Sequence, residues 1–198
     1  MLVLGGVRSG KSRHAQAEAS RFAKVTFVAT ARRSDAEMRR KIAVHRRERP
    51  RDWKTVEAQT NLDRIILSEG ASADVLLVDC LTTYCGGLMT RRGFSAAHRR
   101  HLAEVVEAIQ ATRSSILLVS NEVGSGVVPA FKSGRLYRDV LGELNQQVAS
   151  VASHVVLLVA GVPVLIKGRA CWPAAMTPVC IWFGMAKRIG IASAACRA

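Results

Sequence analysis

The sequence predicts one α/β domain whose central, mostly parallel sheet is flanked by helices. Three observations predict this fold. Short apolar runs alternate along the chain with longer stretches of helical periodicity, as in β-α-β units. The length of 198 residues suits one domain, and no internal repeat or low-complexity linker interrupts it. A glycine-rich segment joins the first predicted strand to the first predicted helix, which is typical of a phosphate-binding fold.

The apolar runs define the predicted elements in chain order. The predicted strands cover 2–4, 25–30, 53–57, 75–79, 116–119, 155–159 and 162–166, and the last two are expected to form a hairpin. The predicted helices cover 12–22, 34–47, 61–68, 95–112 and 136–152. We expect 86–94, which contains two glycines, to be a loop. The domain is expected over 1–167, and 168–198 is an atypical tail without an acidic residue.

The glycine-rich segment carries the clearest chemical signal. The P-loop pattern G-x-x-x-x-G-K-S is matched by Gly5, Gly6, Val7, Arg8, Ser9, Gly10, Lys11 and Ser12. Glycines let backbone N–H groups turn towards phosphate oxygens, and the following helix points its positive end at the same place. Lys11 is expected to reach the β- and γ-phosphates, and Ser12 to bind Mg²⁺. The alternative is a glycine-rich turn without a ligand.

Composition limits the class of protein. The chain has 29 Lys and Arg against 15 Asp and Glu, a net charge of +14, which favours either nucleic acid or polyanionic nucleotides as partners. Because only 5% of the residues are aromatic and no stacking motif accompanies the charge, we expect nucleotides and no nucleic acid. Apolar runs are too short for a membrane span. Five scattered cysteines predict neither disulfides nor a cysteine zinc site, so we expect a cytoplasmic protein.

Polar residues follow several predicted strands. Asp79 ends a buried strand, where a P-loop protein needs an acid to organise Mg²⁺. Asn121 and Glu122 follow the next strand and are candidates for substrate binding or for a general base, although a capped glycine-rich loop is an equal alternative. Thr30 and Arg32 follow the second strand as candidate nucleotide contacts, with an ordinary loop as the alternative.

His45 stands on the basic helix predicted over 34–47. Met38, Ile42 and His45 share one face, and arginine and lysine side chains surround it. Nearby positive charge lowers the pKa of an imidazole, and a neutral imidazole can attack phosphorus. From spacing alone, a core-facing histidine on a solvated basic helix is the stronger interpretation.

Several segments in order resemble one known family. They are GGVRSGKS, VATAR, AVHRRERPRDWKTVEA, LLVDCLTT, LVSNEVGSGVVP, GRLYRDVLGELNQQVA and VVLLVAGVPVLIK. Together they resemble the bifunctional adenosylcobinamide kinase / adenosylcobinamide-phosphate guanylyltransferase family of cobalamin biosynthesis, over 1–167. The resemblance implies that ATP or GTP phosphorylates adenosylcobinamide, and that GTP then donates GMP to the phosphate. It also implies a RecA-like P-loop NTPase fold and a homotrimer.

The resemblance also assigns residues. The histidine that carries GMP in the family matches His45, which reverses the interpretation from spacing. The positions that match the family's GTP-binding segments are Gly5, Gly6, Val7, Arg8, Ser9, Gly10, Lys11, Ser12, Thr30, Ala31, Arg32, Arg46, Arg47, Glu48, Arg49, Glu57 and Asp79. Lys11 is a further catalytic residue, and Mg²⁺ at Ser12 and Asp79 would neutralise the leaving pyrophosphate. Val44 departs from the His-His of many members, and the tail matches nothing in the family.

Two other functions remain open at this point. A simple P-loop kinase for another hydroxyl substrate would form no covalent nucleotide. A basic nucleotide- or RNA-binding module would bind RNA in a salt-sensitive way and turn over neither GTP nor cobinamide.

Overall fold

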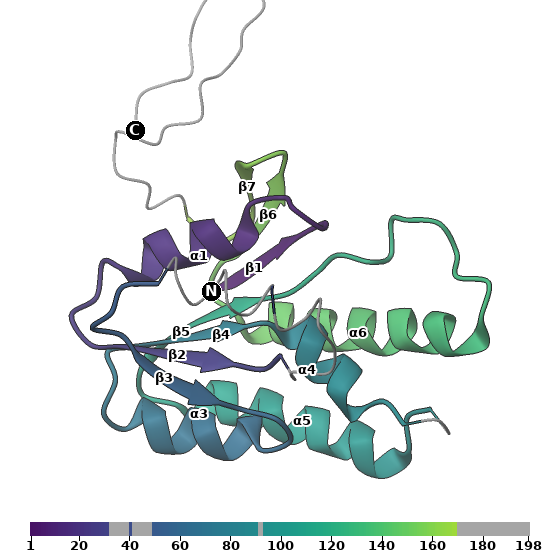
Figure 1. The fold of residues 1–198 in the computed structure, drawn as a ribbon, viewed down its shortest axis with the longest axis horizontal. Coiled ribbons are helices and arrows are strands. Elements are labelled where there is room, and N and C mark those ends of the chain that lie inside the picture. Colours follow the sequence, from purple (N-terminus) through teal and green to yellow (C-terminus); the bar gives the residue numbers. More distant parts are fainter. Residues whose placement is uncertain (32–39, 41–48, 91–92, 170–198) are drawn as a thin grey trace, which may run out of the picture.

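The computed structural model describes residues 1–31, 40, 49–90 and 93–169. It contains a seven-stranded sheet in the order β3-β2-β4-β5-β1-β6-β7, with helices on both faces (Figure 1). The predicted fold class, a mostly parallel sheet flanked by helices, is therefore confirmed. No helix in the described ranges is long and apolar enough to cross a membrane.

The elements alternate between strands and helices for most of the chain. The strands are β1 Leu2–Gly5, β2 Val25–Ala29, β3 Lys54–Glu57, β4 Val75–Asp79, β5 Ser115–Val119, β6 Val155–Val159 and β7 Val162–Lys167. The helices are α1 Lys11–Ala19, α3 Leu62–Gly70, α4 Leu81–Leu88, α5 Ala96–Ala111 and α6 Lys132–Val151.

All strand pairs are parallel except β6 with β7. The first strand lies inside the sheet, where Leu2 pairs with Leu118 of β5 on one side and with Val155 of β6 on the other. The β6–β7 hairpin turns at Ala160 and Gly161, both with positive φ (51° and 84°). Parallel pairing brings the carboxyl ends of β1 to β6 to one edge of the sheet, where ligands bind in open α/β folds.

The inner strands β1, β2, β4, β5 and β6 are largely buried on both faces, which explains their continuous runs of Val and Leu. On one face, α1 packs over Val3, Phe27, Leu77 and Leu117. On the other face, α3, α4, α5 and α6 enclose a larger core (Figure 1). The amphipathic pattern of α5 and α6 is thus explained by burial of one side against the sheet.

The structure corrects two element predictions. The segment 86–94 was expected to be a loop, but its first residues belong to α4, Leu81–Leu88. Leu81, Tyr84, Cys85 and Leu88 are buried at helical spacing, and this packing outweighs the low helix propensity of the two glycines. The last helix begins at Lys132, earlier than predicted. The helix predicted over 34–47 lies outside the described residues.

Candidate functional site

The candidate site lies at the carboxyl edge of the sheet. The P-loop follows β1, Thr30 follows β2, Glu57 ends β3, Asp79 ends β4, and Asn121 follows β5. Backbone hydrogen bonds join these segments: the Glu122 N–H donates to the Gly5 carbonyl (3.1 Å), and the Thr30 N–H to the Asp79 carbonyl (3.4 Å). The parallel sheet therefore gathers at one edge residues that are distant in sequence.

The P-loop has the tight, strained backbone that its sequence predicts. Arg8 has φ 57° and Gly10 has φ 92° just before α1. At Gly5, an added Cβ would lie 2.8 Å from the Leu158 carbonyl oxygen and would collide with the Ser9 hydroxyl. The loop is also held from outside, because the Gly161 N–H donates to the Ser9 carbonyl (3.0 Å). Such a loop at a helix start is suited to binding phosphate.

Lys11 and Ser12 begin α1 beneath this loop. The Ser12 hydroxyl lies 3.4 Å from the Asp79 carboxylate, so the two predicted Mg²⁺ ligands stand side by side. The Lys11 ammonium donates to the Gly6 carbonyl at 2.9 Å. Burial lowers the pKa of Lys11, and the nearby Cys80 and Asp79 oppose that shift. A hydroxyl, a carboxylate and a lysine at a P-loop suit a magnesium-bound triphosphate.

Thr30 connects the ends of β2 and β4. Its hydroxyl accepts from the Cys80 N–H (2.8 Å) and lies 2.7 Å from both the Cys80 carbonyl and the Thr83 hydroxyl. Thr30 is only 2% exposed. Its side chain therefore fixes the backbone after Asp79, and its predicted contact with the nucleotide stays a prediction. Burial beside Asp79 raises the pKa of the Cys80 thiol.

A second set of hydrogen bonds fixes the segment after β5. The Asn121 N–H donates to the Thr82 hydroxyl (2.7 Å), and the Asn145 amide donates to the Asn121 carbonyl (3.1 Å). Tyr137 donates to the Thr82 carbonyl (2.9 Å). Burial raises the pKa of Tyr137, which keeps it a neutral donor. The start of α4 is thereby tied to β5 and to α6.

Glu122 is exposed, and its carboxylate accepts from the Gly124 N–H at 2.6 Å. The Glu122 side chain thus shapes the turn of the loop after β5. Its backbone N–H donates to the Gly5 carbonyl, which places Glu122 next to the P-loop. Glu57 is exposed at the end of β3, an edge strand of the sheet. The predicted roles of these two carboxylates stay predictions.

The basic segment is only partly described. Arg32, His45, Arg46, Arg47 and Glu48 lie outside the described residues. Arg49 places its guanidinium 3.3 Å from the ring centroid of Phe27 in β2, a cation–π contact with the sheet face that α1 covers. Ala31, half-buried, follows Thr30.

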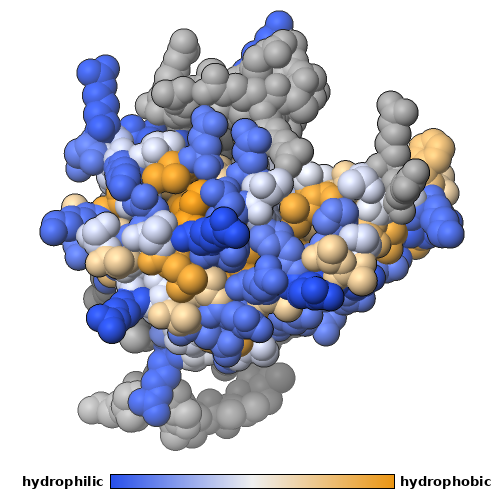
Figure 2. All heavy atoms as spheres, turned by 90° about the horizontal axis from the view of Figure 1, so that it is seen from below, coloured by the Kyte–Doolittle hydropathy of each residue, from blue (hydrophilic) through white to orange (hydrophobic). Residues whose placement is uncertain are grey.

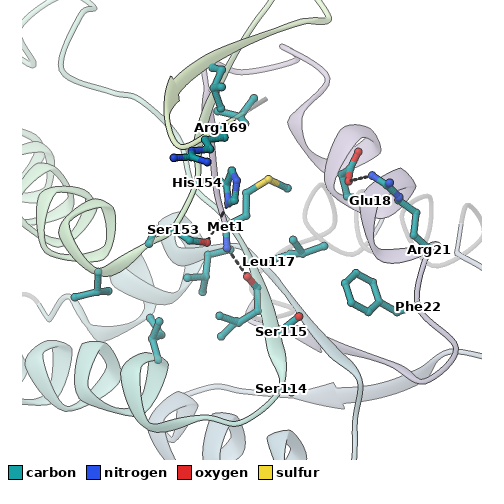
Figure 3. A pocket seen from close by; sticks show the side chains of 17 residues that line it. Met1, Glu18, Arg21, Phe22, Ser114, Ser115, Leu117, Ser153, His154 and Arg169 are labelled. Atoms are coloured by element: carbon teal, nitrogen blue, oxygen red, sulfur yellow. Dashed lines mark hydrogen bonds and ion pairs between the residues drawn. The ribbon is translucent and has the colours of Figure 1, made fainter. Parts of the chain in front are cut away.

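A cavity of about 540 Å³ lies at the opposite edge of the sheet. Met1, Ser115 and His154 line it at the amino ends of the strands (Figure 3). It contains none of the predicted site residues, and parallel α/β sheets bind ligands at the other edge. We therefore place the candidate site at the P-loop.

Three residues of the site network were not predicted to act there. Thr82 and Thr83 belong to α4, which the sequence did not predict. Asn145 is a polar residue on the buried face of α6, between Leu144 and Val148, and it is 6% exposed. A lone polar residue on an apolar helix face was the available signal, since a buried amide needs hydrogen-bond partners.

Comparison with known proteins identifies the family of the chain. The family model described as cobinamide kinase / cobinamide phosphate guanyltransferase matches residues 1–166. A bifunctional adenosylcobalamin biosynthesis protein of Escherichia coli is 38% identical over 179 residues, covering 84% of this chain and 99% of that protein. A second protein with the same description, from Pseudomonas aeruginosa, is 40% identical over 169 residues, and the match covers 85% of this chain and 97% of that protein.

Solved structures show the fold alone. An ATPase of a type III secretion system has a TM-score of 0.52 at 14% identity, and the match covers 80% of this chain but only 50% of that one. A Pyrococcus horikoshii protein has a TM-score of 0.51 at 7% identity, and the match covers 84% of this chain and 85% of that one. The family match over most of the sequence is decisive: the chain belongs to the cobinamide kinase / cobinamide phosphate guanyltransferase family.

Proposed function

We propose that this chain phosphorylates adenosylcobinamide with ATP or GTP and then transfers GMP from GTP to the new phosphate, giving adenosyl-GDP-cobinamide. Family membership supports the pair of reactions. The observation that carries the proposal is the Ser12 hydroxyl beside the Asp79 carboxylate under a complete P-loop, because this arrangement suits a magnesium-bound triphosphate.

In the first reaction the P-loop backbone and Lys11 hold the triphosphate. The substrate hydroxyl attacks the γ-phosphorus, the β–γ bridging bond breaks, and the hydroxyl proton goes to a base. Glu122 is the proposed base or substrate ligand, together with Asn121, because the segment after β5 is hydrogen-bonded to Gly5. When bound at Ser12 and Asp79, Mg²⁺ neutralises charge on the phosphates.

In the second reaction His45 is the proposed nucleophile. A neutral imidazole nitrogen attacks the α-phosphorus of GTP, and pyrophosphate leaves. An oxygen of adenosylcobinamide phosphate then attacks the same phosphorus and releases the imidazole. The proposed GTP contacts are the P-loop, Thr30 to Arg32, Arg46 to Arg49, and Glu57. Arginines near His45 would offset the negative charge at the α-phosphate.

Covalent labelling tests the second reaction. The protein is incubated with GTP labelled at the α-phosphate, denatured, and separated by electrophoresis. We expect an acid-labile label that His45→Ala abolishes and that the matched control His98→Ala keeps, since His98 is a half-buried capping residue at the start of α5 and is not among the proposed GTP contacts. A label that survives His45→Ala would contradict the nucleophile.

The same assay separates the alternatives. Phosphorylation of cobinamide without any covalent label would indicate a simple kinase. Salt-sensitive RNA binding without turnover of GTP and cobinamide would indicate a binding module.

Assembly and location are also proposed. We expect a cytoplasmic homotrimer whose catalytic domain spans 1–167. The edge strand β7 supports contact between copies, because Val162, Val164 and Ile166 are 56%, 43% and 60% exposed. Light scattering during size-exclusion chromatography would test the trimer, and a monomeric mass at micromolar concentration would refute it.

A further inference from the structure

A second cluster of metal-ligand side chains lies between α3 and α5, outside the P-loop site. Asp63 of α3 and His101 and Glu104 of α5 each offer one ligand atom, and these atoms lie within 4.8 Å of one another. We propose that this cluster binds a divalent transition-metal ion such as Zn²⁺, which ties α3 to α5. The proposal does not depend on the proposed reactions.

His101 is held in the orientation that a metal ligand needs. Its Nε2 atom lies 2.5 Å from the hydroxyl of Tyr84, a side chain that is 0% exposed. Metal-bound histidines usually donate their other ring N–H to a carboxylate, a backbone carbonyl or a water, which fixes the tautomer, and a tyrosine oxygen can accept in the same way. If Nε2 carries the proton and donates to Tyr84, the lone pair of Nδ1 is available for the metal.

The spacing of the ligand atoms suits Zn²⁺. His101 Nδ1 lies 3.2 Å from Glu104 Oε2. Two ligands of a tetrahedral zinc ion, each at about 2.0–2.1 Å, lie about 3.3 Å apart. The His–Glu pair therefore already has the separation of two neighbouring zinc ligands, and Asp63 approaches from the other helix.

The carboxylates of the cluster also have too few partners. Asp63 Oδ1 is buried and has no hydrogen-bond partner among the described residues. Among the residues that the structure describes, no lysine or arginine forms an ion pair with Asp63 or Glu104, although the sequence has 29 Lys and Arg. A buried carboxylate oxygen without a partner is costly. A cation between the helices would satisfy it.

The ligand set selects the kind of ion. One imidazole and two carboxylates suit Zn²⁺ and related first-row ions. Mg²⁺ prefers oxygen ligands and keeps several of its waters. We therefore expect it to bind poorly at this cluster and to bind at Ser12 and Asp79. Figure 2 shows the side that α3 and α5 cover in Figure 1, and this side is largely hydrophilic. The side chains of His101 and Glu104 are 21% and 48% exposed, so the cluster can be reached from solvent.

Zn²⁺ binding tests the proposal directly. The nucleotide-free full chain is titrated with Zn²⁺ in a calorimeter, with excess Mg²⁺ present, and thermal unfolding is followed in parallel. We expect Zn²⁺ to bind and to raise the unfolding temperature, because a ligand of the folded state stabilises it. His101→Gln, Asp63→Asn and Glu104→Gln should each weaken binding about tenfold or more.

Glu107→Gln is the matched control, because Glu107 is exposed on α5 and outside the cluster. It should bind Zn²⁺ as the unchanged chain does. Tyr84→Phe removes the hydroxyl that orients His101 and that also accepts the Leu62 N–H (3.3 Å), and it should weaken binding about 10- to 100-fold. Unfolding temperatures without metal show that each variant is folded.

Two results would overturn the proposal. One is the absence of Zn²⁺ binding, or binding that the three ligand variants leave unchanged. The other is a Co²⁺ complex with the strong charge-transfer absorption of thiolate ligands, which would place the metal on cysteines. Neither result bears on the labelling of His45, so failure here is distinguishable from failure of the proposed function.

Discussion

The hydroxyl of Thr30 allows the sharpest prediction about the site. Thr30→Val keeps the shape of the side chain but removes the oxygen that accepts the Cys80 N–H at 2.8 Å and lies 2.7 Å from both the Cys80 carbonyl and the Thr83 hydroxyl. Because Thr30 is 2% exposed, water cannot readily replace these contacts. A lost hydrogen bond and a buried N–H without a partner together cost about 2–3 kcal/mol.

Thr26→Val is the matched control. Thr26 lies in the same strand and is 4% exposed, but its hydroxyl makes no hydrogen bond within the described ranges. Urea unfolding measures both variants. We expect Thr30→Val to lose about 2–3 kcal/mol, which lowers the melting temperature by about 4–12 °C, and Thr26→Val to change little. Equal losses in the two variants would refute the hydrogen-bond argument.

Nucleotide affinity extends the same prediction. Thr30 fixes the backbone that follows Asp79, so Thr30→Val should also weaken binding of magnesium-bound GTP, measured by calorimetry. Unchanged affinity would show that Asp79 is positioned by other contacts.

Three further predictions concern single residues. Gly5→Ala should abolish GTP binding and destabilise the fold, because the added methyl group would meet the Ser9 hydroxyl and the Leu158 carbonyl; normal binding in a fluorescent-nucleotide titration would contradict this. Asp79→Asn should weaken magnesium-bound GTP about tenfold or more while binding without Mg²⁺ changes little, and equal losses in both conditions would contradict a metal role. Burial raises the pKa of Cys85 to about 12, so only about one thiol in ten thousand is a thiolate at pH 8. Iodoacetamide should then leave Cys85 unmodified in the folded protein but not in urea, as peptide mass spectrometry will show.

Features that depend on neighbouring residues in the sequence could be predicted from local sequence patterns. The P-loop could be predicted because its glycines, Lys11 and Ser12 are contiguous and their backbone geometry depends on few neighbours. The strands could be predicted because parallel sheets bury both faces and therefore read as apolar runs. The helix α4 could not, since its two glycines disfavour a helix and tertiary contacts such as the packing of Tyr84 and Leu88 stabilise it.

The sequence by itself determined the phosphate cradle, the parallel sheet and the family, because these depend on periodicity and on contiguous motifs. Only the tertiary structure decided that Thr30 joins β2 to β4, that Asn145 supports Asn121, and that Asp63 meets His101 and Glu104. These partners come from segments distant in the chain. Their contacts exist only because the sheet order and the helix packing bring the segments together. The local spacing of residues in the sequence determines neither the sheet order nor the helix packing.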